Sequence, residues 1–310
     1  MLFQTKNTAP TTRRFAIPLL LLAIAPLLTG CFKHTRLVQK TRRPDVVLDA
    51  TPDQLVSKLN SNFAALQTLN ASVTVTASTG GGSAGKITEY TSFKGFILMR
   101  KPRDLRVILQ VPVLGSAAFE MASVDQNFKL VIPPYNKAMT GTDHSPETPN
   151  KNALYNLRPY IFFDAFFVQG VSSGEFVAVT QSERVLMPDP RKRDAIAEPD
   201  YDLSILHTKV GELSGANLLE TLRVVHYSRV TLLPYQQDIY DTSGRIVTSV
   251  LYDGYQKFGD LNFPTRIDIK RPYDELELKI VITKLTANKP LDDDSFQLEI
   301  PAGYTLQKMN

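Results

Sequence analysis

The stretch Phe93-Lys94-Gly95-Phe96-Ile97-Leu98-Met99 places apolar side chains on both faces of one predicted strand. One face carries Phe93, Ile97 and Met99. The other face carries Tyr90, Phe96 and Leu98. A sheet that buries only one face alternates apolar and polar residues cleanly. Two apolar faces favour a strongly curved sheet, with a helix on one side and an apolar cavity on the other. The filled core of an ordinary sandwich would explain the pattern equally well.

Strand patterns continue on both sides of this stretch. From Ala71, small apolar residues alternate with threonine and serine, which is typical of a strand. Apolar runs separated by turn residues predict further strands at 87–99, 104–111, 117–124, 127–133, 175–187, 201–209, 222–232, 236–241, 245–253, 265–270 and 276–285. The chain is therefore predicted to be mainly β, with about eleven antiparallel strands and two helical regions.

The first helical region begins at Thr51-Pro52-Asp53-Gln54, which combines an N-cap, a proline for the first turn and a glutamine that completes a capping box. Leu55, Leu59, Phe63 and Leu66 follow at helical spacing. A helix of about 16 residues is expected to bury this apolar stripe.

The second helical region, Tyr155–Val168, is the most aromatic segment of the chain. Pro159 is expected to break it into two short helical pieces. So many aromatic side chains need burial. They are expected either to fill the core or to form a lid over the mouth of an apolar cavity.

The N-terminus has the pattern of a secretory signal with a lipoprotein ending. Arg13-Arg14 precedes an apolar run of 14 residues, Phe15–Leu28. A membrane-spanning helix needs roughly 20 residues, so this run is short for one. Leu28-Thr29-Gly30-Cys31 resembles the bacterial lipobox, whose cysteine is acylated and becomes the mature N-terminus. An uncleaved short anchor is the alternative.

We expect a signal peptide over residues 1–30, an acylated cysteine and flexible tether over 31–50, and one domain over 51–310. Without the signal peptide the chain carries 32 basic and 31 acidic groups, so the net charge of +4 belongs largely to the signal. This balance argues against a nucleic-acid partner. The basic tether is expected to be a solvated linker or to contact anionic headgroups. Phe32 stands where an aspartate, in enterobacterial-type sorting, would favour the inner membrane, so we expect an outer-membrane anchor with the domain facing the periplasm.

The sequence contains no pattern typical of an enzyme or a metal site. The histidines lie in separate segments without carboxylates at metal-ligand spacing: His34, His144, His207 and His226. The motifs of serine hydrolases, zinc proteases and dithiol oxidoreductases do not occur. Asp292-Asp293-Asp294 lacks the further ligands of a calcium site. The charged segment Pro188–Asp194 predicts a solvated hairpin tip. We expect no enzymatic activity, no cofactor and no metal.

Short motifs in a fixed order resemble the LolA/LolB-like family of bacterial outer-membrane lipoprotein carriers and receptors. Phe93–Leu98, followed by Arg100-Lys101-Pro102, resembles the carrier's Gly-x-Leu strand that ends in Arg-Pro. Pro112-Val113-Leu114-Gly115-Ser116 resembles the receptor's Pro-Leu-Gly-Ser loop with one residue inserted. Leu251–Tyr255 and Phe263–Ile267 resemble late strands of the family.

The resemblance implies an unclosed half-barrel of about eleven antiparallel strands, with helices covering an apolar cavity. It also implies a function closer to the membrane-anchored receptor than to the carrier. The protein would accept the acyl chains of lipoproteins from a periplasmic lipoprotein carrier and help to deliver them to the outer membrane.

The resemblance also assigns roles to residues. Leu114 matches the leucine that helps to insert cargo into the membrane. Arg100 and Lys101 lie where the carrier has its lid-latching arginine, but the arginine here is displaced by one residue. The side chains expected to form the cavity or its lid are Phe93, Phe96, Leu98, Tyr160, Phe162, Phe163, Phe166 and Phe167.

Two other functions stay open. The first is a structural or envelope-assembly lipoprotein with a filled core and a protein partner. The second is a binder of another amphiphile, a glycolipid or phospholipid, in the same cavity. We expect a monomer that contacts the membrane through its N-terminal lipid.

Overall fold

The structure, a computed structural model, describes residues 36, 40–143, 153–187, 195–211, 213–259 and 261–309. The predicted signal peptide, Cys31, His34, His144 and the charged segment 188–194 lie outside the described residues. The chain forms two compact units. One comprises the described residues of 1–42 and 187–196, and the other the described residues of 43–186 and 197–310. In the smaller unit, β1 (Thr41–Arg42) pairs in parallel with the first two residues of β10 (Ala195–Val210).

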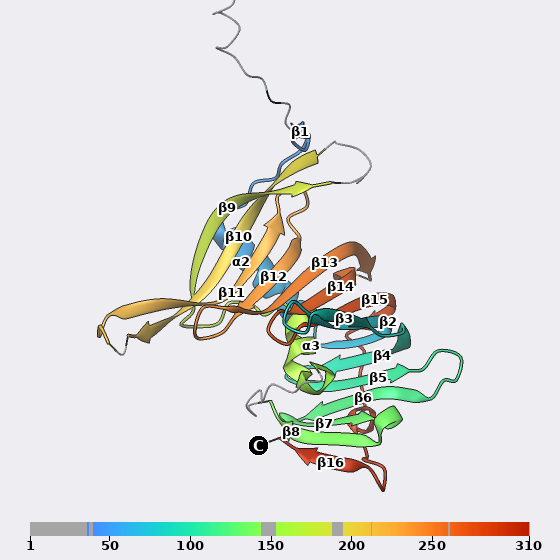
Figure 1. The fold of residues 1–310 in the computed structure, drawn as a ribbon. Coiled ribbons are helices and arrows are strands. Elements are labelled where there is room, and N and C mark those ends of the chain that lie inside the picture. The colour runs from blue at the N-terminus through green and yellow to red at the C-terminus, as the bar shows by residue number, and fades with distance from the viewer. Residues whose placement is uncertain are drawn as a thin grey trace, which may run out of the picture. The chain divides into compact units, whose positions relative to one another are not determined.

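The larger unit is built on strands that follow one another along the chain and pair mostly with their neighbours (Figure 1). Its first strands are β2 (Thr68–Gly81), β3 (Lys86–Glu89), β4 (Phe93–Arg100), β5 (Asp104–Gln110), β6 (Ala117–Val124), β7 (Asn127–Ile132) and β8 (Lys137–Thr142). Later strands are β9 (Phe176–Leu186), β10, β11 (Asn217–Ser228), β12 (Pro234–Tyr240), β13 (Ile246–Phe258), β14 (Leu261–Arg271), β15 (Leu276–Ala287) and β16 (Thr305–Lys308).

Strand β15 joins the two series because it pairs antiparallel with β2 from Leu276 opposite Thr79 to Ala287 opposite Leu69. The strand order is β1-β10-β11-β12-β13-β14-β15-β2-β4-β5-β6-β7-β8-β16, with β3 on β2 and β9 on β10. The two ends of this order are not paired to each other among the described residues. The prediction of a mainly β, unclosed sheet with covering helices is confirmed.

The sheet contains more strands than the sequence predicts, since 16 strands lie in the described part of the chain. The predicted strand 87–99 is two strands, β3 and β4, separated by Tyr90, Thr91 and Ser92. Strands β8 and β16 were not predicted. Both are short, and the four residues of β16 are exposed. Backbone pairing with a neighbour forms such strands without a regular apolar pattern.

The alternation predicted for β2 is present in its packing. Ala71, Val73, Val75 and Ala77 are buried, whereas the residues between them are half-buried. The buried face belongs to the main core, which includes the inner residues of β4 to β7 and of β14 and β15. The covered side of the sheet is thus a continuous apolar surface.

Helix α2 (Pro52–Ala65) begins as predicted. The Thr51 hydroxyl accepts the Gln54 N–H at 3.2 Å, and the Gln54 side chain accepts the Thr51 N–H at 2.8 Å, so the capping box is confirmed. Leu55 and Leu59 pack against Tyr201, Leu203 and Ile205 of β10 in a second core. The Asn288 side chain ends the helix, because its amide donates to the Ala65 carbonyl at 2.7 Å.

The aromatic segment forms two pieces as predicted, the 3-10 helix η4 (Ala153–Asn156) and helix α3 (Pro159–Phe166). Pro159 occupies the first turn of α3, where its missing N–H costs nothing. The α3 residues Ile161, Phe162, Phe163 and Phe166 are buried in the main core. Helix α3 therefore covers the inner face of the sheet.

In the described part of the chain, no helix is both long enough and apolar enough to cross a membrane.

Candidate functional site

An apolar cavity of about 250 Å³ lies at the inner face of the first strands, and we call it the β2–β7 cavity. Strand residues such as Val75, Val107 and Phe119 form its wall. Leu157 and Phe162, before and within α3, contribute to its lining from the covering side. Its lining residues are aliphatic, proline, phenylalanine or tyrosine. Such a cavity favours an alkyl chain, because burying apolar surface is worth about 25 cal/mol per Å².

The turn between β5 and β6 begins at the wall of this cavity, because Val111 lines the cavity. The Val111 N–H donates to the Ser116 carbonyl at 2.8 Å, and the Gly115 N–H donates to the Val111 carbonyl at 3.0 Å. Val113 is fully exposed and Leu114 is 77% exposed. Two apolar side chains therefore project into solvent at the rim of an apolar cavity.

The conformation of Val113 is strained. Its φ is 70°, which is rare for a β-branched residue. The Leu114 N–H donates to the Pro112 carbonyl at 2.8 Å, so Val113 is the centre of a three-residue turn. Strain of this kind is common where function requires an exposed or fixed group.

The predicted cavity residues divide among several places. Phe93 and Phe162 line the β2–β7 cavity. Phe166 and Phe167 line a different pocket, against α2. Phe163 stacks on Phe167 with ring centres 5.8 Å apart. Tyr160 is half-buried and packs against the main core.

The structure corrects the prediction that Phe96 and Leu98 belong to the cavity, because neither side chain lines it. Strand β4 directs Phe93, Gly95, Ile97 and Met99 to the inner face, so the alternate positions lie on the outer face. Phe96 is 43% exposed there. Phe96 and Leu98 do share the outer face of β4, but Tyr90, predicted on the same face, precedes the strand and lines the cavity with Phe93.

Arg100 and Lys101, the predicted lid latch, separate in the structure. Arg100 pairs with Asp104 at 2.8 Å and with Asp293 at 2.7 Å, and its guanidinium lies over the Phe296 ring. It therefore holds the C-terminal 3-10 helix η5 (Asp293–Phe296), and these contacts do not include α2 or α3. Asp293 serves as an ion-pair partner in this segment.

Lys101 contacts both helices. Its ammonium donates to the Phe63 carbonyl of α2 and lies 3.4 Å from the centre of the Phe63 ring. It also lies 5.3 Å from the centre of the Phe167 ring, directly after α3. Burial lowers the pKa of the Lys101 ammonium. Lys101 is thus placed to join the two covering helices.

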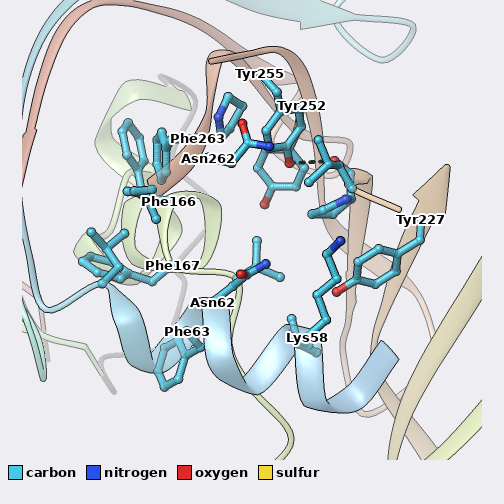
Figure 2. Close-up of a pocket in the computed structure, with 17 residues that line it drawn as sticks. Lys58, Asn62, Phe63, Phe166, Phe167, Tyr227, Tyr252, Tyr255, Asn262 and Phe263 are labelled. Atoms are coloured by element: carbon cyan, nitrogen blue, oxygen red, sulfur yellow. Dashed lines mark hydrogen bonds between the residues drawn. The ribbon is translucent and has the colours of Figure 1, made fainter. Parts of the chain in front are cut away.

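A second pocket, of about 200 Å³, lies between α2 and strands β11, β13 and β14, and we call it the α2 pocket. Figure 2 shows phenylalanine rings on one side, including Phe166 and Phe263. Lys58 and Tyr227 lie on the other side. No sequence motif predicts this pocket, because its residues come from α2 and from strands that lie far apart along the chain.

Two buried tyrosines line the α2 pocket. Tyr227 is 0% exposed and Tyr252 is 5% exposed. Neither hydroxyl has a hydrogen-bond partner among the described residues. Burial raises the pKa of both hydroxyls, so each stays protonated at neutral pH.

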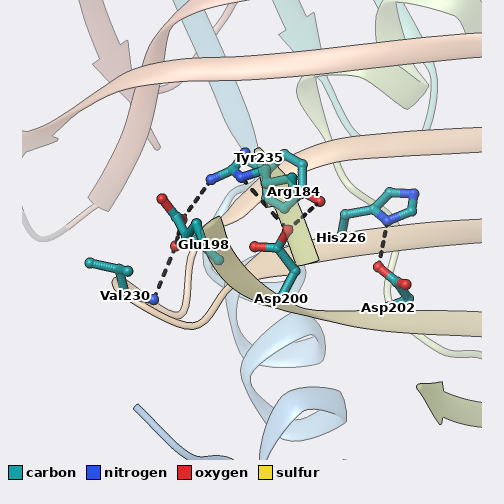
Figure 3. Close-up of polar contacts among 8 residues, drawn as sticks. Arg184, Glu198, Asp200, Asp202, His226, Val230 and Tyr235 are labelled. Atoms are coloured by element: carbon teal, nitrogen blue, oxygen red, sulfur yellow. Dashed lines mark hydrogen bonds and ion pairs between the residues drawn. The ribbon is translucent and has the colours of Figure 1, made fainter. Parts of the chain in front are cut away.

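A polar cluster lies on strands β9 to β12, as Figure 3 shows. Asp200 is fully buried and accepts the Tyr235 hydroxyl at 2.9 Å. Arg184 pairs with Glu198 at 2.7 Å and lies 3.4 Å from the centre of the Tyr235 ring. Burial raises the pKa of Asp200 to about 6. Most charged groups of the cluster therefore have partners on neighbouring strands of the sheet.

His226 lies between two carboxylates of neighbouring strands. Its Nδ1 is 2.7 Å from Asp202 and its Nε2 is 3.2 Å from Asp238. Burial opposes the charged ring, but hydrogen bonds to Asp238 and Asp202 outweigh it and raise the pKa of His226. His226 is thus held in the sheet by hydrogen bonds from both ring nitrogens. Within the described ranges, no group of His, Cys, Asp and Glu side chains could hold a metal ion.

No protein-family model matches the sequence, and no curated protein matches it. Among solved structures, a DUF1329 family protein from Desulfovibrio piger is similar, with 14% identity and a TM-score of 0.49 over 79% of this chain and 95% of that chain. A LolA superfamily protein from Nitrosomonas europaea has 12% identity and a TM-score of 0.47 over 81% of this chain and 99% of that chain. A domain described as an outer membrane lipoprotein-sorting protein from Vibrio parahaemolyticus has 10% identity and a TM-score of 0.45 over 79% of this chain and 94% of that chain. At these identities the likeness concerns the fold alone.

Proposed function

We propose that the protein is an outer-membrane-anchored lipoprotein that takes the acyl chains of other lipoproteins into the β2–β7 cavity and passes them to the membrane. The observation that carries this proposal is that Val111 belongs both to the cavity wall and to the exposed turn. An acyl chain leaving the cavity at this rim would meet Val113 and Leu114, whose side chains are exposed.

The energetics favour a handover between two apolar sites. Moving a 16-carbon acyl chain out of a membrane costs about 12 kcal/mol, at about 0.8 kcal/mol for each methylene. A periplasmic carrier has to offset most of this free energy by burying the acyl chain in an apolar site. The receiving protein needs only a comparable apolar site. The cavity of about 250 Å³ is smaller than a typical ligand pocket of about 300–1,000 Å³. We infer that α3 moves aside to admit a whole chain and that Lys101 opposes this movement.

The anchor and its membrane belong to the same proposal. Cys31 would carry the acyl groups, and two or more long chains hold a protein on a bilayer. The domain would then face the periplasm next to the membrane that receives the cargo.

The test is a transfer assay with the lipid-anchored protein in liposomes. A fluorescent acylated peptide is presented, and binding and entry into the bilayer are recorded separately. We expect Leu114→Glu to keep binding and to slow entry at least tenfold, because a charge cannot enter the apolar bilayer. Leu306→Glu, at a leucine 47% exposed in β16, is the matched control and should transfer normally. Equal transfer by Leu114→Glu and the unsubstituted protein would refute the role of the turn.

A second candidate function is an envelope-assembly lipoprotein with a protein partner. The hairpin between β10 and β11 favours it, because Val210, Leu213, Leu218 and Leu219 are exposed there. In the same assay, no binding of the acylated peptide at micromolar protein would favour this candidate over lipid transfer.

A further inference from the structure

The α2 pocket contains hydrogen-bond donors that the fold leaves without acceptors. The Tyr227 and Tyr252 hydroxyls are buried, and neither finds a partner among the described residues. Buried polar groups in folded proteins are nearly always hydrogen-bonded. Two such hydroxyls in one pocket indicate that the pocket is shaped for an acceptor supplied from outside the chain.

Lys58 adds a positive charge to the same pocket. It is half-buried on α2 and lines the pocket. In the chain as described, no carboxylate forms an ion pair with it. Tyr227, Asn62 and Asn262 line the same pocket as Lys58, as Figure 2 shows. An ammonium and phenolic hydroxyls together suit an oxygen-rich anion, because Lys offers three donors and no acceptor.

The opposite side of the pocket is apolar. Phe166 and Phe263 line it, and their rings are 6.2 Å apart. A free inorganic anion would gain nothing from these side chains. A ligand that uses both sides must have an anionic end joined to an alkyl chain.

We propose that the α2 pocket binds the anionic end of an amphiphile, a carboxylate or a phosphate carried by an alkyl chain. The oxygen atoms accept from Lys58, Tyr227 and Tyr252, and the first carbons of the chain lie among the phenylalanine rings. The pocket volume of about 200 Å³ suits such an end and not a whole lipid. The site is separate from the β2–β7 cavity, because the two share no lining residue.

The test is calorimetric titration of the mature chain from residue 31, with Cys31→Ser so that no attached lipid competes. The ligands are laurate, dodecyl phosphate, dodecanol and inorganic phosphate, below their micellar concentrations. We expect the two anionic amphiphiles to bind at least tenfold more tightly than dodecanol, and inorganic phosphate to bind far more weakly. The order of laurate and dodecyl phosphate identifies the headgroup, and either order supports the proposal.

Variants separate the site from a structural role. Lys58→Met should remove the preference for the anions at least tenfold and leave dodecanol binding unchanged. Lys284→Met, at an exposed lysine of β15, is the matched control and should behave like the unsubstituted chain. Tyr227→Phe and Tyr252→Phe should weaken anion binding without lowering the melting temperature, because each removes a hydroxyl that the protein itself leaves unpaired.

Two results would overturn the proposal. One is equal affinity for laurate and dodecanol. The other is a lowered melting temperature with unchanged anion affinity in both tyrosine variants, which would mean that ordered water satisfies the hydroxyls. Binding of the acylated peptide is measured on the same variants, so failure of this site is distinguishable from failure of lipoprotein binding in the β2–β7 cavity.

Discussion

The ammonium of Lys101 lies 3.4 Å from the centre of the Phe63 ring, and it donates a hydrogen bond to the Phe63 carbonyl. Phe63 belongs to α2, and Phe167, whose ring the same ammonium also approaches, directly follows α3. One side chain thus connects the two helices that cover the sheet. Its neighbour Arg100 instead contacts Asp104 and the C-terminal segment.

Lys101→Met should loosen both helices. The cation–π contacts and the hydrogen bond are lost, and we expect a decrease of about 1–2 kcal/mol in the free energy of unfolding. Hydrogen exchange should become faster in Pro52–Ala65 and Pro159–Phe166. Arg100→Met is the control and should accelerate exchange in Asp293–Phe296 instead. Unchanged exchange of both helices in Lys101→Met would contradict the latch.

Val113→Gly should stabilise the protein. Glycine adopts the φ of 70° freely, so the variant relieves backbone strain of about 1–3 kcal/mol. The added freedom of the unfolded chain offsets about 0.5–1 kcal/mol of that gain. Denaturant unfolding should show a net gain of about 1 kcal/mol in the free energy of unfolding. In the liposome assay, the variant should transfer the acylated peptide more slowly, because one exposed apolar group is lost. Leu114→Ala, the comparison variant, should slow transfer without a gain in stability. A lower unfolding midpoint for Val113→Gly would show that the turn is not strained.

Gly95→Ala should disrupt the pairing of β4 with β5. A Cβ atom at Gly95 would lie 1.9 Å from the Ile108 carbonyl oxygen, which is backbone and cannot turn away. We expect a loss of at least about 2 kcal/mol in the free energy of unfolding. Gly82→Ala meets no atom within 4 Å and should change stability by less than about 0.5 kcal/mol. Similar stability of the two variants would mean that β4 does not approach β5 this closely.

His226→Gln should destabilise the protein mainly at acid pH. The pKa of His226 is raised in the fold, so the stability from its charged contacts is complete below the unfolded pKa and is lost as the pH rises through the folded pKa. Burial opposes ionisation of Asp238, but hydrogen bonds from His226, Ser249 and Gln236 to its carboxylate outweigh burial and lower the pKa of Asp238. The stability that the Asp238 carboxylate contributes is lost as the pH falls through its folded pKa. We expect the variant to lose about 1.5–3 kcal/mol at pH 5.5 and much less at pH 9.

Unfolding in urea at the two pH values measures this difference. His207→Gln is the comparison, because its ring is 37% exposed beside Glu220 and should contribute less. An equal loss for His226→Gln at both pH values would show that the ring acts as a neutral hydrogen-bonding group.

Local sequence rules were sufficient where neighbours along the chain decide the structure. The capping box at Thr51 and Gln54 forms because both partners lie within one turn. The break at Pro159 follows from the geometry of proline. The same rules failed for Phe96, because an apolar residue on a strand does not reveal which face of the sheet is covered.

By itself, the sequence determined the mainly β class, the two covering helices and the strand–turn stretch that contains Leu114, whereas the lipid anchor at Cys31 stays a prediction. These depend on periodicity, caps and motifs that span a few residues. Only the tertiary structure decided that Lys101 joins the helices while Arg100 does not, and that Lys58, Tyr227 and Tyr252 share one pocket. Those residues lie on α2, β11 and β13, and it is the pairing of the intervening strands that places them together.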